Sequence, residues 1–223
     1  MSDTDSFIDE VTEEVRRDRL FLMLKRYGWI GGVAVALIVG GAAYREYDRA
    51  QTAAAAQALG DQMIAALDQN DSAERAEALG AIAADTASGQ ALQKLLEAGA
   101  LVEAGDREAA VAALNLVGSN GDVAEIYRHI ATFRALVLQQ DTLSAADRRL
   151  QFEALARPGA PLDLLAKEQL ALIDIELGET DAAIIKLQEI TEAADATADL
   201  KDRATQVIVA LGGSLDAAEP QDG

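Results

Sequence analysis

The chain has no cysteine, one histidine, three prolines and few aromatic residues, which make up 4% of its 223 residues. Without cysteine it can form neither a disulfide nor a thiolate. His129 alone cannot build a zinc or transition-metal site, which takes several nitrogen or sulfur ligands. No glycine-rich loop joins a strand to a helix, so a phosphate-binding loop is not expected either. We therefore predict a protein that is not an enzyme, with no cofactor or metal, and with His129 at the surface or packed in a helix hairpin.

Acidic residues are in excess, with 38 Asp and Glu against 19 Lys and Arg. Beyond residue 44 the chain has 31 acidic and 14 basic residues. A surface of this sign repels phosphate, so nucleic acid is excluded as a natural partner. Neighbouring acids such as Glu74 and Glu77 are interpreted as solvated helix faces, because close carboxylate pairs arise by chance at this density. No regular calcium loop of alternating acids around a glycine is present.

One run, Tyr27–Tyr44, is free of charge over eighteen residues and reads YGWIGGVAVALIVGGAAY. A helix of this length covers about 27 Å, close to the hydrocarbon thickness of a bilayer. We predict a transmembrane helix over 27–44. A buried core helix and a cleavable signal peptide are the alternatives. A signal peptide begins with a short basic region, whereas 26 residues with seven acids and five bases precede this run.

Basic residues near the run predict its orientation. Two follow it, Arg45 and Arg49. Five precede it: Arg16, Arg17, Arg19, Lys25 and Arg26. The bias predicts a single pass through the inner membrane of a bacterium, with the N-terminus in the cytoplasm and the larger C-terminal part in the periplasm.

Small residues recur every four positions along the predicted span, at Gly28, Gly32, Ala36 and Gly40. This spacing puts them on one face of a helix. Such a face lets another helix approach closely in lipid. We interpret it as a helix–helix contact, either with a second copy of the protein in a homo-oligomer or with a different membrane protein. Chance recurrence of two abundant residues is the alternative.

Two terminal segments flank these parts. Residues 1–26 are predicted to form a cytoplasmic amphipathic arm in which Phe7, Val11 and Val15 share a helix face. The arm either is a solvated helix that only fixes topology, or docks onto a cytoplasmic protein or the membrane surface. The tail at 212–223 is predicted to be disordered and acidic.

The segment 45–211 is rich in Ala, Leu, Glu and Gln, and it lacks alternating β-branched runs. Its apolar spacing and its Gly and Pro breaks predict an all-α domain. The expected helices lie near 45–69, 73–87, 90–104, 107–117, 122–139, 145–156, 162–177, 181–194 and 199–211. One side of the helix at 90–104 is predicted to carry its apolar residues, namely Leu92, Leu95, Leu96, Gly99 and Val102.

Two predicted hairpins, 95–114 and 169–188, resemble each other. The residues that align are Gly105 with Gly178, Ala98 with Ala171, and Ala110 with Ala183. Small residues on both sides of a turn glycine let two helices cross closely, which is typical of a tetratricopeptide repeat. We predict a tetratricopeptide-like α-solenoid, with helices at 122–139 and 145–156 as the unit between. The bulky aromatics and closing proline of that repeat are missing, and a generic Ala-rich helical bundle is the alternative.

Residues 5–44, DSFIDEVTEEVRRDRLFLMLKRYGWIGGVAVALIVGGAAY, resemble the start of the YfgM-like proteins. They share a short helix, a basic pair, a Lys-Arg-Tyr-Gly-Trp entry and one span. Residues 158–211, from PGAPLDLLAKEQLALIDIELGETDAAI to the closing helix, are similar to the same family. YfgM-like proteins are ancillary subunits of the bacterial Sec translocon with degenerate tetratricopeptide repeats.

The resemblance implies partners that periodicity does not show. It implies Sec translocon subunits and a periplasmic chaperone of the prolyl-isomerase type as partners. The role would be to assist transfer of secreted polypeptides to periplasmic folding factors. The family has no catalytic residues to carry over. A membrane-tethered adaptor for another envelope process, such as cell division or outer-membrane assembly, is the alternative.

Overall fold

The computed structural model describes residues 3–213, with side chains for residues 21, 23 and 25–213. All regular secondary structure in this range is helical, which confirms the predicted all-α class. The protein divides into two compact units, Met1–Ala58 and Leu59–Gly223. The acidic tail predicted at 212–223 lies, beyond Gly213, outside the described residues.

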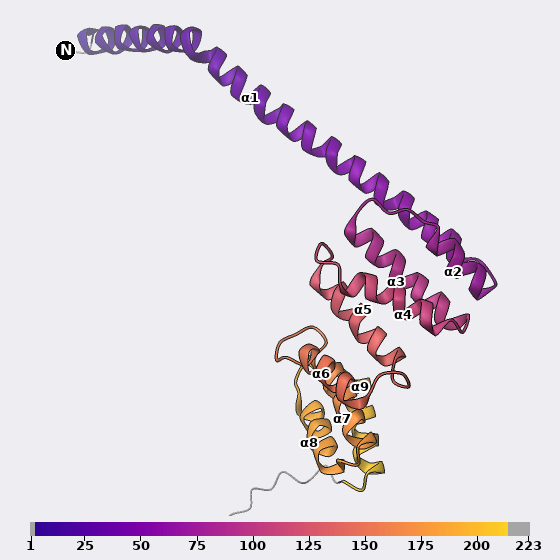
Figure 1. The fold of residues 1–223 in the computed structure, drawn as a ribbon. Coiled ribbons are helices and arrows are strands. Elements are labelled where there is room, and N and C mark those ends of the chain that lie inside the picture. The colour runs from indigo at the N-terminus through magenta and orange to yellow at the C-terminus, as the bar shows by residue number, and fades with distance from the viewer. Residues whose placement is uncertain (1–2, 214–223) are drawn as a thin grey trace, which may run out of the picture. The chain divides into compact units, whose positions relative to one another are not determined.

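Helix α1 spans Asp3–Leu67 (Figure 1) and makes up the described part of the first unit, while its residues from Leu59 on are counted with the second unit. Every residue from 25 to 58 is exposed. Within the described residues, Lys25–Leu67 is the one stretch of helix long and apolar enough to cross a membrane. The predicted span at 27–44 lies within it. The apolar face predicted for the arm at 1–26 falls on side chains outside the described set.

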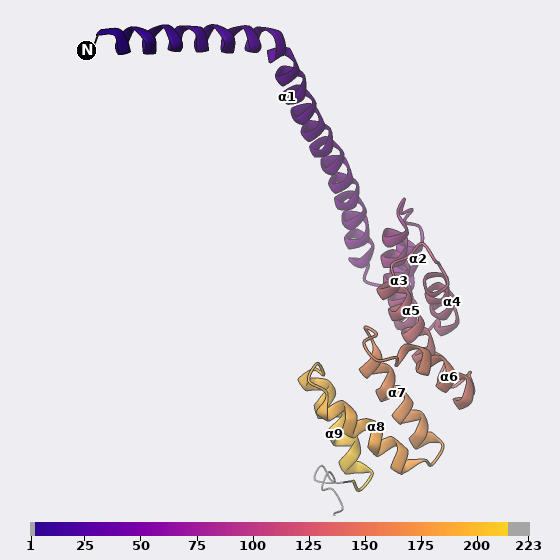
Figure 2. The same ribbon diagram turned by 90° about the vertical axis from the view of Figure 1, so that its left-hand side faces the viewer.

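The second unit contains the last turns of α1 and eight further helices of the described residues. Their bounds are α2 Ser72–Gly80, α3 Ala87–Glu103, α4 Arg107–Gly118, α5 Glu125–Leu138, α6 Ala145–Leu155, α7 Asp163–Glu176, α8 Thr180–Glu192 and α9 Ala198–Ala210. Successive helices pack against each other along the unit (Figures 1 and 2). From α2 onward, the contact between α5 and α6 is the least extensive of these.

Four apolar clusters form the core as a series. The first joins the end of α1 to α2 and α3 through Ala66, Leu79 and Ala100. The second joins α3, α4 and α5 through Leu95, Leu114 and Ala131. The third joins α5, α6 and α7 through Leu136, Phe152 and Leu170, and the fourth joins α7, α8 and α9 through Ala171, Leu187 and Ile208. Because each cluster involves only helices that are consecutive in the sequence, the unit has the neighbour-by-neighbour architecture of a solenoid.

Capping side chains start several of these helices. The Asp71 carboxylate accepts hydrogen bonds from the N–H groups of Ala73 and Glu74 at 2.9 and 3.0 Å. The Thr86 hydroxyl accepts one from the N–H of Gly89 at 3.1 Å. Such bonds satisfy N–H groups that have no partner within the helix.

The prediction of a helix over 73–87 is wrong at its C-terminal end, because Thr86 caps the start of the next helix. Helix α2 ends at Gly80, residues 81–86 form a loop, and α3 begins at Ala87 rather than at residue 90. The Gln90 side chain holds this loop by donating to the Ala84 carbonyl at 2.9 Å. The other predicted helix ends between residues 69 and 211 agree with the structure within three residues.

The apolar side predicted for α3 is only partly its buried side. Leu92 and Val102 are exposed, while Ala91, Leu95 and Ala98 are buried. Helix α3 packs against α2 and against α4. Its buried surface therefore wraps around two sides of the helix, and alanine occupies much of it because neighbouring helices approach closely.

Candidate protein-interaction site

The two hairpins that align in sequence are α3–α4 and α7–α8. Their turn glycines, Gly105 and Gly178, have φ angles of +84° and +78°, in the left-handed region where a side chain is unfavourable. In each turn the N–H of the following residue bonds to the carbonyl five positions before it, at 2.9 and 2.8 Å. Both helices therefore end in the same Schellman turn.

Four aligned alanines lie in the interiors of these hairpins. Ala98 and Ala110 belong to the cluster around α3, α4 and α5, and Ala171 and Ala183 belong to the cluster around α7, α8 and α9. All four are fully buried. A methyl side chain at such a position permits a close helix crossing.

The small residues of the predicted span lie on the surface of α1. Gly28, Gly32, Ala36 and Gly40 are all exposed. A Cβ built on each of the three glycines would meet no atom within 4 Å. No described part of the protein covers these four residues. Their role as a surface for packing against another helix therefore stays a prediction.

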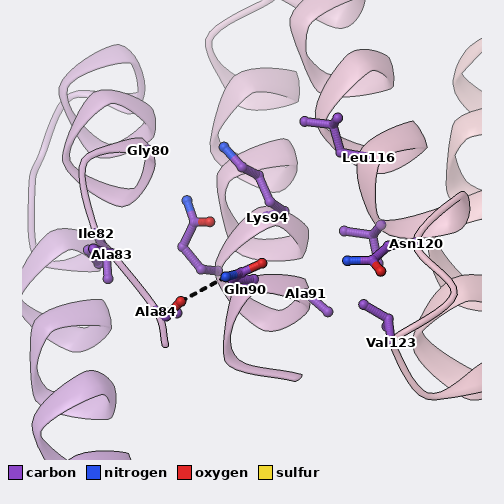
Figure 3. Close-up of a pocket in the computed structure, with 12 residues that line it drawn as sticks. Gly80, Ile82, Ala83, Ala84, Gln90, Ala91, Lys94, Leu116, Asn120 and Val123 are labelled. Carbon is purple, nitrogen blue, oxygen red and sulfur yellow. Dashed lines mark hydrogen bonds between the residues drawn. The ribbon is translucent and has the colours of Figure 1, made fainter. Parts of the chain in front are cut away.

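A groove of about 460 Å³ lies between the loop after α2, the first turns of α3, and the end of α4 (Figure 3). Its floor is apolar, with buried Ala91, Val117 and Val123. Leu116 stands at one edge and is 62% exposed. Apolar side chains in a concave surface with an accessible edge favour burial of a partner's apolar group.

The rim of the groove is polar and nearly neutral. Lys94 is the one charged residue that lines it, and its ammonium group lies 2.7 Å from the Glu97 carboxylate. Figure 3 shows Lys94 and Gln90 along α3, across from Asn120. In the described structure the N–H of Ala83 bonds to no protein group. Amide side chains and free backbone groups beside an apolar floor suit an extended, uncharged polypeptide segment.

An ionic cluster around the buried Asp174 joins α6, α7 and α8. Asp174 on α7 is 1% exposed, and its carboxylate accepts hydrogen bonds from Arg149 at 2.8 Å and from Lys186 at 2.6 Å. Arg149 also donates to Glu179 at 2.8 Å, and Arg148 pairs with Glu176. The hydrogen bond to Glu179, with the charge of Asp174, raises the pKa of Arg149 against the opposing effect of burial.

The sequence patterns did not identify this cluster. Asp174 occurs at a position where a tetratricopeptide repeat has a bulky side chain, inside the apolar stretch LALIDIEL. An acidic residue inside an apolar stretch of a helix is the one sequence feature that points to the cluster. Such a residue is expected to be buried, and a buried carboxylate needs basic partners. A second ionic contact ties α9 to α7, where Arg203 donates two hydrogen bonds to Glu168 at 2.9 and 3.0 Å. This pairing raises the pKa of Arg203.

His129 lies on α5 with most of its side chain buried. Its Nε2 atom is 3.4 Å from the Glu125 carboxylate, and its Nδ1 atom is buried without a hydrogen-bond partner. Among the described residues, no three His, Asp or Glu side chains are grouped closely enough to hold a metal ion. His129 therefore has a packing environment rather than a cluster of reactive groups around it.

Residues 25–155 match a known protein family, described as a tetratricopeptide repeat-like domain. The match extends over more than half of the sequence and includes the predicted span, helices α2 to α6 and the whole groove. It ends before the second aligned hairpin, α7–α8. No curated protein and no solved structure matches the sequence. The match confirms the prediction of a tetratricopeptide-like fold and does not favour the alternative, a generic Ala-rich helical bundle.

Proposed function

The chain belongs to the tetratricopeptide repeat-like domain family, and from this premise we propose that it is a membrane-anchored scaffold for protein–protein interaction. Solenoids of this kind use extended surfaces to bind peptides and partner proteins. The candidate span in α1 supports the anchor. The observation that carries the proposal is the groove, because its apolar floor and neutral rim lie in a protein with a net charge of −19.

The partners follow from the resemblance of residues 5–44 and 158–211 to the YfgM-like proteins. We propose that the protein associates with the Sec translocon and assists transfer of secreted polypeptides to a periplasmic chaperone. An unfolded polypeptide leaving the translocon is extended and exposes apolar side chains. Such a segment fits the groove through burial of apolar groups and through hydrogen bonds to the amide side chains of Gln90 and Asn120.

Site-specific photocrosslinking in cells tests the role of the groove. A photoreactive residue at position 116 should crosslink to a secreted polypeptide arrested in the translocon. A photoreactive residue at position 150 is the control, because Leu150 is similarly exposed, at 69% against 62% for Leu116, and lies outside the groove. Equal crosslinking from both positions would exclude the groove as the binding site.

Co-purification in mild detergent tests the partners. The wild-type protein should retain translocon subunits and a periplasmic chaperone. If these are absent and cell-division or outer-membrane assembly proteins are recovered instead, the protein is an adaptor for that process.

Leu116→Gln should reduce the recovery of arrested polypeptide about fivefold, while Leu150→Gln should leave it unchanged.

A further inference from the structure

A hollow of about 550 Å³ lies on helix α1 at the C-terminal end of the predicted span. Its apolar part is formed by Leu37, Ile38, Gly41 and Ala42. A Cβ built on Gly41 would meet no atom within 4 Å. The small residues at 41 and 42 therefore leave room on the helix surface, next to the larger and exposed side chains of Leu37 and Ile38.

Three charged residues complete the hollow, and two of them are arginines. Arg45 and Arg49 lie four positions apart on one face of α1, and Glu46 lines the hollow beside them. Within the described part of the chain, none of these three side chains has an ion-pair or hydrogen-bond partner. The hollow therefore has a net positive charge, although the chain beyond residue 44 has 31 acidic and 14 basic residues.

The depth of the two arginines matches the headgroup layer of a bilayer. Arg45 directly follows the predicted span at 27–44, and Arg49 lies about 6 Å further along the helix axis. The headgroup layer adds about 5–7 Å on each side of the hydrocarbon core. For a helix along the bilayer normal, both arginines therefore lie at the level of the lipid phosphates.

The direction of the helix brings these arginines towards the membrane. Side chains on an α-helix lean towards its N-terminus. Arg45 and Arg49 therefore lean back over the turn that contains Gly41, whereas Lys25 and Arg26 at the other end lean away from the span. At the C-terminal end, helix geometry thus places guanidinium groups next to apolar side chains that face lipid.

We propose that this hollow binds the headgroup of an anionic phospholipid, in the leaflet on the C-terminal side of the span. Arg45 and Arg49 hold the phosphate, because a guanidinium offers parallel N–H donors that match phosphate oxygens. Leu37 and Ile38 contact the upper part of the acyl chains. Glu46 repels the anionic headgroup and so weakens its binding. This lipid site rests on the proposed transmembrane helix, but it requires no protein partner.

Site-specific photocrosslinking tests the lipid site with full-length protein in nanodiscs that hold one copy each. A photoreactive residue at position 38 lies in the hollow. Position 36 is the control, because Ala36 is also exposed but lies about 200° around the helix. The nanodiscs consist of phosphatidylcholine with a trace of acyl-labelled phosphatidylglycerol, phosphatidylethanolamine or phosphatidylcholine. Position 38 should crosslink phosphatidylglycerol about fivefold more than phosphatidylcholine, as expected for one net positive charge near the surface. Position 36 should crosslink both equally.

Variants assign the preference to the charged residues of the hollow. Arg45→Gln combined with Arg49→Gln should abolish it, and the two lysine substitutions should retain part of it. Glu46→Gln should increase it, because the repelling carboxylate is lost. The control combines Lys25→Gln with Arg26→Gln, which removes two charges at the other end of the span and should leave the preference unchanged. Circular dichroism of each variant shows whether the helix content is retained.

Three results would overturn the lipid site: no preference at position 38, an equal preference at positions 38 and 36, or a preference that survives in the paired glutamine variant. A fourth is preferred crosslinking of phosphatidylethanolamine that Glu46→Gln removes, since the hollow would then recognise a zwitterionic headgroup through its ammonium group. Excess inorganic phosphate should leave the crosslinking unchanged, and complete displacement would make the arginines a site for free phosphate. Failure of the transmembrane helix gives a different result, because the protein would then not enter nanodiscs and neither position would crosslink any lipid.

Discussion

Single small residues set how closely the helices of this protein approach. At Gly118 a built Cβ would lie 2.8 Å from the Thr132 hydroxyl. The backbone of α4 at this glycine therefore lies directly against a side chain of α5. The fully buried Ala98 and Ala171 have the same effect within the two aligned hairpins. The repeat alignment identified these alanines from spacing alone. The alignment could not identify Gly118, because this glycine permits the contact between α4 and α5 and does not form a turn within either aligned hairpin.

The turn at Gly178 gives a prediction at this scale. Gly178→Ala should lower the free energy of unfolding by about 1–2 kcal/mol, because its φ of +78° places a Cβ in the left-handed region. Thermal or denaturant unfolding of the full-length protein in detergent, followed by circular dichroism, measures this. Gly121→Ala is the control, since that glycine is exposed with no atom within 4 Å of a built Cβ. Equal effects at both glycines would contradict the assigned strain.

At the scale of helices, the ionic cluster connects α6 to α7 and α7 to α8. Arg149 connects α6 to Asp174 on α7, and Lys186 connects the same carboxylate to α8. The pKa of Arg149 is raised above its ordinary value by its hydrogen bond to Glu179 and by the charge of Asp174. A base with a raised pKa stabilises the fold at every pH below its unfolded value and loses that contribution only at higher pH. Arg149 therefore stays charged throughout the physiological range.

Removal of the charge on Asp174 tests this role. Asp174→Asn should lower the free energy of unfolding by about 2 kcal/mol, because Lys186 loses its carboxylate partner and Arg149 keeps only Glu179. Unfolding of the full-length protein in detergent provides the measurement. The matched control is Asp141→Asn, whose side chain is 71% exposed and pairs with Arg107. A surface pair of this kind contributes about 0.5 kcal/mol or less. If the two substitutions cost the same, the cluster does not join these helices.

For the whole molecule, two independent features meet in one polypeptide: an apolar run in α1 and a tetratricopeptide-like unit from residue 59 onward. The run is exposed in the structure over residues 25–58. Apolar side chains such as Val35, Leu37 and Ile38 are each at least 60% exposed. Exposed apolar surface of this extent is unfavourable in water, which is consistent with a helix that spans a membrane.

The proposed orientation predicts the outcome of reporter fusions. Alkaline phosphatase fused after Gly223 should be active, because it folds outside the cytoplasm, and a cytoplasmic fluorescent reporter at the same position should be dark. The same two reporters fused before Met1 should give the reverse pattern. The membrane fraction should also retain the protein after carbonate extraction. An active cytoplasmic reporter at the C-terminal fusion would reverse the proposed topology.

The sequence by itself determined the all-α class, the candidate span, most helix ends and the two aligned turns. These properties are local, because they depend on hydrophobic spacing, on runs without charge and on glycine at single positions. Only the tertiary structure decided that Leu92 is exposed while Ala91 is buried, that Asp174 meets Arg149, and that Gln90 and Leu116 line one groove. Some of these relations join residues on different helices. The others depend on which sides of a helix have neighbouring helices. Helical periodicity describes one helix at a time, so it contains no information about which neighbour each side meets.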